Sequence, residues 1–310
     1  MDAAFFLAGN RRFREDSNAA GHVLRCNNGV TRALEALNTS HTIRNYFQTL
    51  YGAWGCQHWW PAESAFEVVV GAYLTQNTSW TNVERALDGL RQARMMNVAG
   101  IRRAPLRKLE QAIRSSGYYR QKAQRLKTFV RFLNRHYGGS LARMFAEPTA
   151  KLRKELLALD GVGPETADSI LLYAGNHPVF VVDAYTRRIM ERHGLVSSEA
   201  SYEEIREMFE TALTQRADEL LKVSSAGNTA DRPLGASHPP SRMSTAPRSA
   251  TAQVFNEMHG LIVGVGKNYC KKSQMECEQC PLRRFLPEGR VANVGALGSN
   301  GRRLHANPRH

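Results

Sequence analysis

Residues 159–188 read LDGVGPETADSILLYAGNHPVFVVDAYTRR, and this stretch indicates the fold more strongly than any other part of the chain. It opens with a turn in which Gly161 and Gly163 permit positive φ and a close approach of the backbone to a partner. Pro164 suits the first position of a helix, where an N–H would be unpaired. Apolar side chains then recur with helical spacing at Ala167, Ile170, Leu171 and Ala174. The pattern predicts an amphipathic helix whose N-terminal N–H groups and positive dipole end could hold a phosphate.

A single carboxylate follows this predicted helix. The apolar run 179–182 ends at Asp183, and the basic residues Arg187 and Arg188 come soon after. Each part alone has an ordinary explanation, because Gly-x-Gly before a helix is usually a simple turn and Asp183 could cap the next helix. The combination in this order is more specific than any of its parts.

The whole stretch resembles the helix-hairpin-helix signature of the base-excision DNA glycosylases, whose superfamily name records the hairpin, the Gly/Pro-rich loop and the final Asp. The resemblance implies that Asp183 is the catalytic residue. Its carboxylate would stabilise the oxocarbenium-like sugar, or activate water, as the C1′–N bond breaks. It also implies that one set of hairpin residues binds DNA phosphate: Gly161, Val162, Gly163 and Thr166.

Two further motifs sharpen the resemblance. Residues 71–78, GAYLTQNT, resemble the segment of endonuclease III relatives that supplies a polar wedge, which implies that Gln76 enters the duplex where the flipped base has left. The alternative for Gln76 is a polar residue at a helix end. The Trp-Trp-Pro at 59–61, with Trp80 and the SGYYRQKA at 116–123, resembles the 3-methyladenine DNA glycosylase III subgroup. In that subgroup the matching aromatic residues line the base pocket, which implies this role for Trp59, Trp60 and Trp80, with ordinary packing as the alternative.

Glu165 decides which chemistry we expect. Endonuclease III proper carries a lysine at this point of the hairpin, and that lysine attacks the sugar to form a Schiff base. A carboxylate cannot form an imine, so the sequence predicts a monofunctional glycosylase that uses water. Its expected substrates are N3- or N7-alkylated purines, whose positive charge is attracted to aromatic faces. The alternatives are an endonuclease III-like glycosylase and abasic-site lyase acting on oxidised pyrimidines, and a non-catalytic helix-hairpin-helix DNA-binding protein.

The late cysteines form an incomplete metal motif. Cys270, Cys277 and Cys280 have the spacing C-x6-C-x2-C, which matches the first three ligands of the endonuclease III iron–sulfur loop. Four thiolates normally hold such a cluster, but Leu286 occupies the expected fourth position. Three interpretations stay open: a 4Fe–4S cluster with an unusual fourth ligand, a zinc site completed by a residue such as His259, or a vestigial loop without metal. Glycosylase catalysis itself requires no cofactor.

The charge of the chain agrees with a polyanionic partner. The 310 residues carry a formal net charge of +14, and phosphates supply most of the non-specific affinity of such a protein. We therefore expect double-stranded DNA with damaged bases as the partner. No apolar run approaches the roughly 20 residues of a membrane helix, so we expect no membrane association. The expected location is the cytoplasm, at the nucleoid, and the expected state is a monomer.

Helical periodicity with almost no strand pattern predicts an all-α fold of two helical lobes. A DNA-binding cleft would lie between the lobes, and an iron–sulfur-type loop would lie near the C-terminus. The segment 222–251 is rich in Ser, Ala, Pro and Gly and has too few large apolar residues to fold, so we expect it to be a disordered insert. The expected boundaries are an uninterpreted leader at 1–40, a helical glycosylase core at 41–221 with about 62–175 as one lobe, a disordered insert at 222–251, a return helix and Cys-rich loop of the second lobe at 252–287, and a disordered tail at 288–310.

Overall fold

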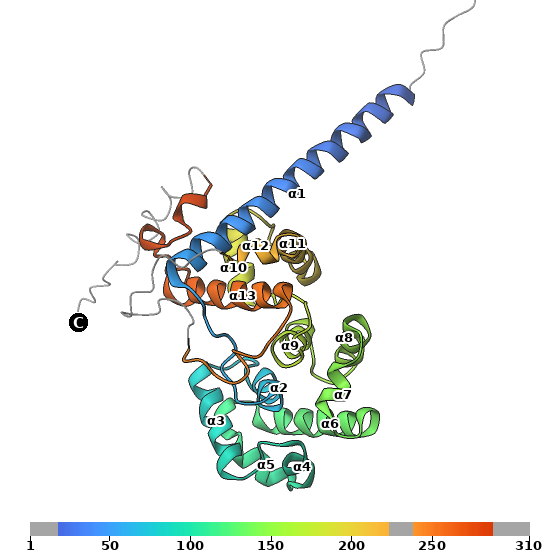
Figure 1. Cartoon of the computed structure of the whole chain (residues 1–310), viewed down its shortest axis with the longest axis vertical. Helices are drawn as coiled ribbons and strands as arrows, with labels where there is room; N and C mark the ends of the chain where they lie inside the picture. The colour runs from blue at the N-terminus through green and yellow to red at the C-terminus, as the bar shows by residue number, and fades with distance from the viewer. Residues whose placement is uncertain (1–17, 223–237, 288–310) are drawn as a thin grey trace, which may run out of the picture. The chain divides into compact units, whose positions relative to one another are not determined.

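The structure is a computed structural model that describes residues 18–222 and 238–287, with side chains from residue 36 onward. The chain divides into two units, Met1–Thr39 and Ser40–His310, and the features below belong to the second. Figure 1 shows that the described part is built from helices joined by short loops. Within it the sole strand-like pairing is an isolated bridge between Cys270 and Met275, so the all-α prediction is confirmed.

The helices follow one another with few long connections. Their bounds are α1 Asn18–Trp54, α2 Ala65–Leu74, α3 Trp80–Gln92, α4 Val98–Arg103, α5 Leu106–Ala112, η1 Arg114–Ser116, α6 Tyr119–Tyr137, α7 Leu141–Phe145, α8 Thr149–Leu157, α9 Pro164–Ser169, η2 Ile170–Ala174, α10 Ala184–Arg192, α11 Tyr202–Thr214, α12 Ala217–Leu220, α13 Ala250–Asn268, η3 Cys277–Gln279 and η4 Arg283–Phe285. In the described residues no helix is both long enough and apolar enough to cross a membrane.

Two buried helices organise the packing. Helix α2 packs against α3, α6, α9 and η2, and its residues 66–74 are all buried. Helix α13 is buried over most of its length and packs against α10, α11, α12 and η2. Because η2 contacts both buried helices, it joins the set of helices around α2 to the set around α13. Apolar burial of this extent is the main favourable term that holds such helices together.

The predicted hairpin lies between α8 and α9. The N–H of Val162 donates to the carbonyl of Leu159 at 3.1 Å, which closes the turn. Gly161 has φ +74°, and a Cβ on this residue would collide with the side chain of Arg125. Pro164 occupies the first turn of α9, as predicted. The predicted amphipathic helix continues beyond α9 as the π-helical turn η2, a rare conformation that occurs mostly as a single turn within α-helices.

Part of the segment predicted to be a disordered insert has a defined course. Its residues 223–237, the tail 288–310 and the leader residues 1–17 lie outside the described residues, whereas 238–249 have a defined course. In this segment the N–H of Met243 donates to the carbonyl of Ala62 at 3.0 Å, and the N–H of Ala62 donates to Ser241 Oγ at 3.1 Å. The composition predicted disorder because the segment buries little apolar surface. Residues 238–249 are held instead by hydrogen bonds to the loop before α2.

Candidate active site

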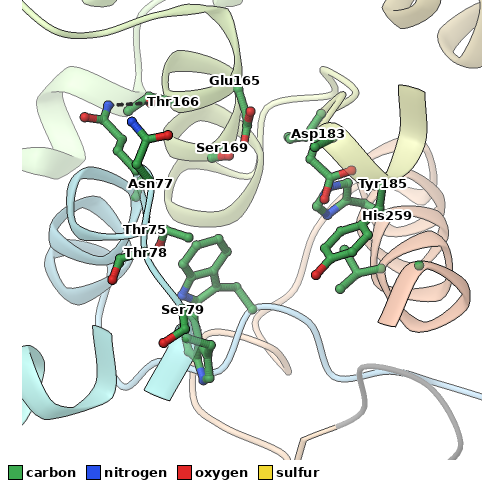
Figure 2. A pocket seen from close by; sticks show the side chains of 18 of the residues that line it. Thr75, Asn77, Thr78, Ser79, Glu165, Thr166, Ser169, Asp183, Tyr185 and His259 are labelled. Atoms are coloured by element: carbon green, nitrogen blue, oxygen red, sulfur yellow. Dashed lines mark hydrogen bonds and ion pairs between the residues drawn. The ribbon is translucent and has the colours of Figure 1, made fainter. Parts of the chain in front are cut away.

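One pocket collects the predicted site residues. Its volume is about 1130 Å³, and it is lined by the loop before α2, the α2–α3 turn, the hairpin, α9, α10 and α13 (Figure 2). Every residue predicted for catalysis, base binding, wedge or phosphate contact lines it: Trp59, Trp60, Gln76, Trp80, Gly161, Val162, Gly163, Glu165, Thr166 and Asp183. These residues come from segments up to about 120 positions apart in the sequence, so tertiary packing brings them together.

Asp183 caps α10 and also faces the pocket. Its Oδ1 accepts hydrogen bonds from the Thr186 N–H at 2.7 Å and from Thr186 Oγ1 at 3.0 Å. Its Oδ2 lies 3.6 Å from His259 Nε2, and the side chain is 14% exposed. Burial alone would raise the pKa of Asp183, but His259 and the bonds from Thr186 outweigh it and hold the pKa below its usual value. The capping role therefore leaves one charged carboxylate oxygen for chemistry.

Glu165, which the resemblance to endonuclease III predicts to replace the lyase lysine, lies in the first turn of α9. The surrounding protein and the negative charge of Asp183 raise the pKa of Glu165 to about 7, while His259 opposes the shift. Glu165 is therefore only partly ionised near neutral pH, although its side chain is reached by solvent. Two acidic groups whose pKa values are shifted in opposite directions occupy one pocket, which is a common arrangement in acid–base catalysis.

Gln76 does not project freely into the pocket. Its Nε2 donates to the carbonyl of Gly161 at 3.0 Å and to Thr166 Oγ1 at 2.9 Å. Its Oε1 accepts from Arg125 Nη1 at 3.0 Å. The amide thus ties the end of α2 to the hairpin and to α6. The neighbouring Asn77 also lines the pocket, is exposed and has φ +52°. Entry of Gln76 into a duplex stays a prediction, and it requires these three hydrogen bonds to exchange.

The predicted aromatic residues form one connected cluster beside the pocket. The Trp60 ring lies edge-on to Trp59 at 5.7 Å and to Trp80 at 5.3 Å between centroids. Trp59 and Trp60 are each 6% exposed, whereas Trp80 is more accessible and its indole N–H donates to Glu84 at 2.9 Å. The two predicted roles of these residues, core packing and lining of the base pocket, therefore do not exclude each other. Each ring packs against the core and also lines the pocket.

The pocket also contains residues whose place in it the sequence did not predict. His259 lines it from α13, and four basic residues line it as well: Arg188, Lys267, Lys271 and Lys272. The protein around Lys267 lowers the pKa of its amine, while Asp183 and Glu84 oppose the shift. An amine is therefore present in the pocket, although α9 carries Glu165 there and not a lysine. The basic character of 267–272 was visible in the sequence, but its position beside Asp183 depends on the packing of α13 against α10.

The cysteine loop does not assemble a metal site from the described residues. No group of three His, Cys, Asp or Glu side chains in this part of the chain is placed to hold a metal ion. Cys270 Sγ instead accepts a hydrogen bond from Arg192 Nη1 at 3.1 Å. His259 lies away from these cysteines, because ten residues, nine of them in α13, separate it from Cys270, roughly 14 Å along the helix. Its ring contacts Tyr173 and Asp183, and no described contact joins it to the cysteines, so a zinc site completed by His259 stays a prediction.

Comparisons with known proteins agree with the fold and the pocket. The sequence profile of the HhH-GPD superfamily of base excision DNA repair proteins matches residues 70–215. A protein of Methanocaldococcus jannaschii, provisionally named a DNA repair glycosylase, is 38% identical over 250 residues, which cover 80% of this chain and 97% of that protein. Endonuclease III of Bacillus subtilis is 24% identical over 232 residues, covering 75% and 85% of the two chains.

Solved structures give the same assignment. The 3-methyladenine DNA glycosylase of H. pylori, bound to 1,N6-ethenoadenine, has a TM-score of 0.58 and 27% identity, covering 74% of this chain and 97% of that one. A trapped covalent complex of endonuclease III with DNA has a TM-score of 0.56 and 22% identity, covering 81% and 95%, and shows the shared fold. The chain therefore belongs to the HhH-GPD superfamily of base excision DNA repair proteins, and its enzymatic activity is that of a DNA N-glycosylase.

Proposed function

We propose that this DNA glycosylase is monofunctional and hydrolyses the N-glycosidic bond of alkylated purines. One observation carries the proposal: a charged aspartate, a cluster of tryptophans and a glutamate in place of the lyase lysine lie in the same pocket. The H. pylori relative, which contains an adenine derivative in its solved structure, supports a purine substrate. A cationic base gains roughly 0.5–2 kcal/mol from contact with an aromatic face, which favours alkylated over ordinary purines.

The proposed reaction gives each group in the pocket a role. The target nucleotide must leave the stack, because the glycosidic bond is unreachable inside the duplex. When the C1′–N bond breaks, its electron pair goes to the base and neutralises the positive charge of the alkylated purine. Asp183 Oδ2 faces the cation that develops on the sugar and stabilises it. Water then forms the new bond to C1′, and its proton passes to a pocket carboxylate.

Base release from methylated DNA tests the proposal. The wild-type protein should release 3-methyladenine or 7-methylguanine, identified by chromatography of the free bases. Asp183→Asn should slow release by at least about 10²-fold, because a charge that stabilises the transition state is lost. Its DNA affinity, measured by fluorescence anisotropy, should remain close to wild type. Release of oxidised pyrimidines with no release of methylated purines would contradict the proposed substrate class.

Lys267 supports a second candidate, a glycosylase with lyase activity. Its amine lines the pocket and interacts electrostatically with Asp183, so it could attack the sugar in place of the missing hairpin lysine. Borohydride reduction distinguishes the two, since only an imine intermediate becomes covalently trapped on DNA. We expect no trapped complex on abasic or oxidised DNA. A trapped complex that disappears in Lys267→Gln but persists in Lys271→Gln would establish the lyase alternative.

A further inference from the structure

His259 lies behind Asp183 in a position that the mechanism above does not use. Its side chain is nearly buried, and the rings of Trp59, Tyr173 and Phe180 surround it at centroid distances of 6.0, 5.9 and 6.4 Å. Its Nδ1 lies 2.6 Å from the Tyr173 hydroxyl. Its Nε2 has no hydrogen-bond partner among the described residues and lies 3.6 Å from Asp183 Oδ2. Figure 2 shows the His259 and Asp183 side chains next to each other at the pocket wall.

The surroundings determine which ring nitrogen carries the proton. Tyr173 is buried, and this burial raises its pKa well above the usual value, so the phenol keeps its proton. If Nδ1 carried the proton of a neutral ring, Nε2 would turn its lone pair toward a carboxylate oxygen, which is repulsive. If the Tyr173 hydroxyl donates to Nδ1, the Nε2–H points toward Asp183 Oδ2, which is attractive. Electrostatics therefore favours the tautomer protonated at Nε2.

We propose that His259 is a positioning residue for the catalytic carboxylate. Tyr173 fixes the tautomer, His259 Nε2–H orients Asp183 Oδ2 toward the sugar, and Thr186 holds Oδ1. The two oxygens of Asp183 are thus fixed from two helices, α10 and α13. The separation of 3.6 Å is longer than a hydrogen bond, and such contacts commonly shorten when substrate fills an active site. This inference deepens the proposed glycosylase mechanism and rests on it for its catalytic consequence.

The charges around Asp183 give the expected dependence on pH. Five other groups act on it from the elements packed around the pocket: Thr186 on α10, Glu165 on α9, Tyr173 on η2, and His259 and Lys267 on α13. His259 contributes to the low pKa of Asp183. Without His259 the pKa of this carboxyl rises, so protonation inactivates the enzyme at a higher pH. The acidic limb of the rate profile should therefore move upward in pH.

Two substitutions separate this role from simple packing. His259→Phe keeps a buried ring but removes both nitrogens, whereas His259→Gln keeps an N–H near the position of Nε2. In single-turnover base release, we expect His259→Phe to be slower by about 10- to 100-fold, the range for a misplaced reacting group, with DNA affinity unchanged. Its acidic limb should lie at higher pH, and His259→Gln should recover most of the rate. Equal rates in wild type and His259→Phe would overturn the proposal, as would equal losses in both variants with an unmoved acidic limb.

Nitrogen NMR of histidine-labelled full-length protein tests the tautomer without any substrate. The chain has 10 histidines, and the His259 signals are those absent from His259→Phe. At about pH 9, above the usual titration range of histidine, we expect a protonated Nε2 and an unprotonated Nδ1, and Tyr173→Phe should weaken this preference. A proton on Nδ1 would refute the inference. The expected tautomer without release of alkylated bases would instead refute the proposed substrate while leaving the arrangement of His259 intact.

Discussion

Individual residues in this pocket serve structure and chemistry together. Asp183 uses Oδ1 to cap α10 and leaves Oδ2 at the pocket, so the ordinary and the catalytic interpretation of the same residue agree. The sequence predicted Asp183 because a specific order of motifs precedes it. It gave no local signal for His259, because one histidine on an apolar helix face is most often a packed core residue. His259 joins the site only when α13 packs against α10.

Glu165 should make the stability of the protein depend on pH. Its pKa is raised to about 7 in the folded protein, whereas it is about 4.5 for the free group, so the folded state binds the proton more tightly. The protonated Glu165 therefore stabilises the folded state at low pH. This contribution is lost as the pH rises from about 4.5 to 7, because the carboxyl group then loses its proton. Glu165→Gln removes that loss and should raise the melting temperature at pH 8 by a few degrees at most, with no effect at pH 4. Thermal unfolding by circular dichroism measures this.

The double variant provides the control for this prediction. The charge on Asp183 is one of the causes of the raised pKa of Glu165. The gain from Glu165→Gln at pH 8 should therefore shrink in an Asp183→Asn background. A gain of the same size at pH 4 and pH 8 would show that the glutamate affects stability through something other than its proton.

At the scale of elements, the hairpin shows what sequence patterns can and cannot predict. Glycine spacing and Pro164 predicted the turn and the start of α9, because both are local backbone preferences. The bonds of Gln76 to Gly161, Thr166 and Arg125 could not be predicted, because they connect three elements distant in sequence. The cysteine spacing alone left the metal content of this loop open. The loop is held in part by Arg188 and Arg192, which donate to the backbone carbonyls of Cys270 and Lys271 at 2.8 Å.

The two hairpin glycines form a matched pair for testing this element. Gly161 has φ +74° and no room for a Cβ beside Arg125, whereas Gly163 has φ −91° and open space around it. Gly161→Ala should lower the free energy of unfolding by about 1–2 kcal/mol, the cost of a left-handed residue with a side chain, whereas Gly163→Ala should leave it within about 0.5 kcal/mol. Urea unfolding measures both. Equal losses in the two variants would show that the backbone conformation at Gly161 is not what the fold requires.

At the scale of the whole molecule, charge and packing act on the same pocket. The chain carries a net charge of +14, and the α13 end brings Lys267, Lys271 and Lys272 to the pocket that holds Asp183. Lys271 is paired with Glu276 at 2.7 Å. Lys272 is exposed and forms no ion pair within the described residues, so it is the better candidate for a phosphate contact. The sequence predicted a basic protein, but only the fold indicates which cations share a pocket with Asp183.

Salt titration tests whether Lys272 contacts DNA. Each phosphate contact releases condensed counterions, so the slope of log affinity against log salt concentration should fall in magnitude by about 1 when one contact is lost. We expect this change in Lys272→Gln, with affinity reduced uniformly across DNA sequences. Lys108→Gln is the matched control, because Lys108 is an exposed lysine on α5 that does not line the pocket. If both variants lowered the slope equally, the affinity would come from the overall charge of the protein. A reduction confined to Lys272→Gln would place the phosphate backbone at the α13 end of the pocket, which also contains Asp183.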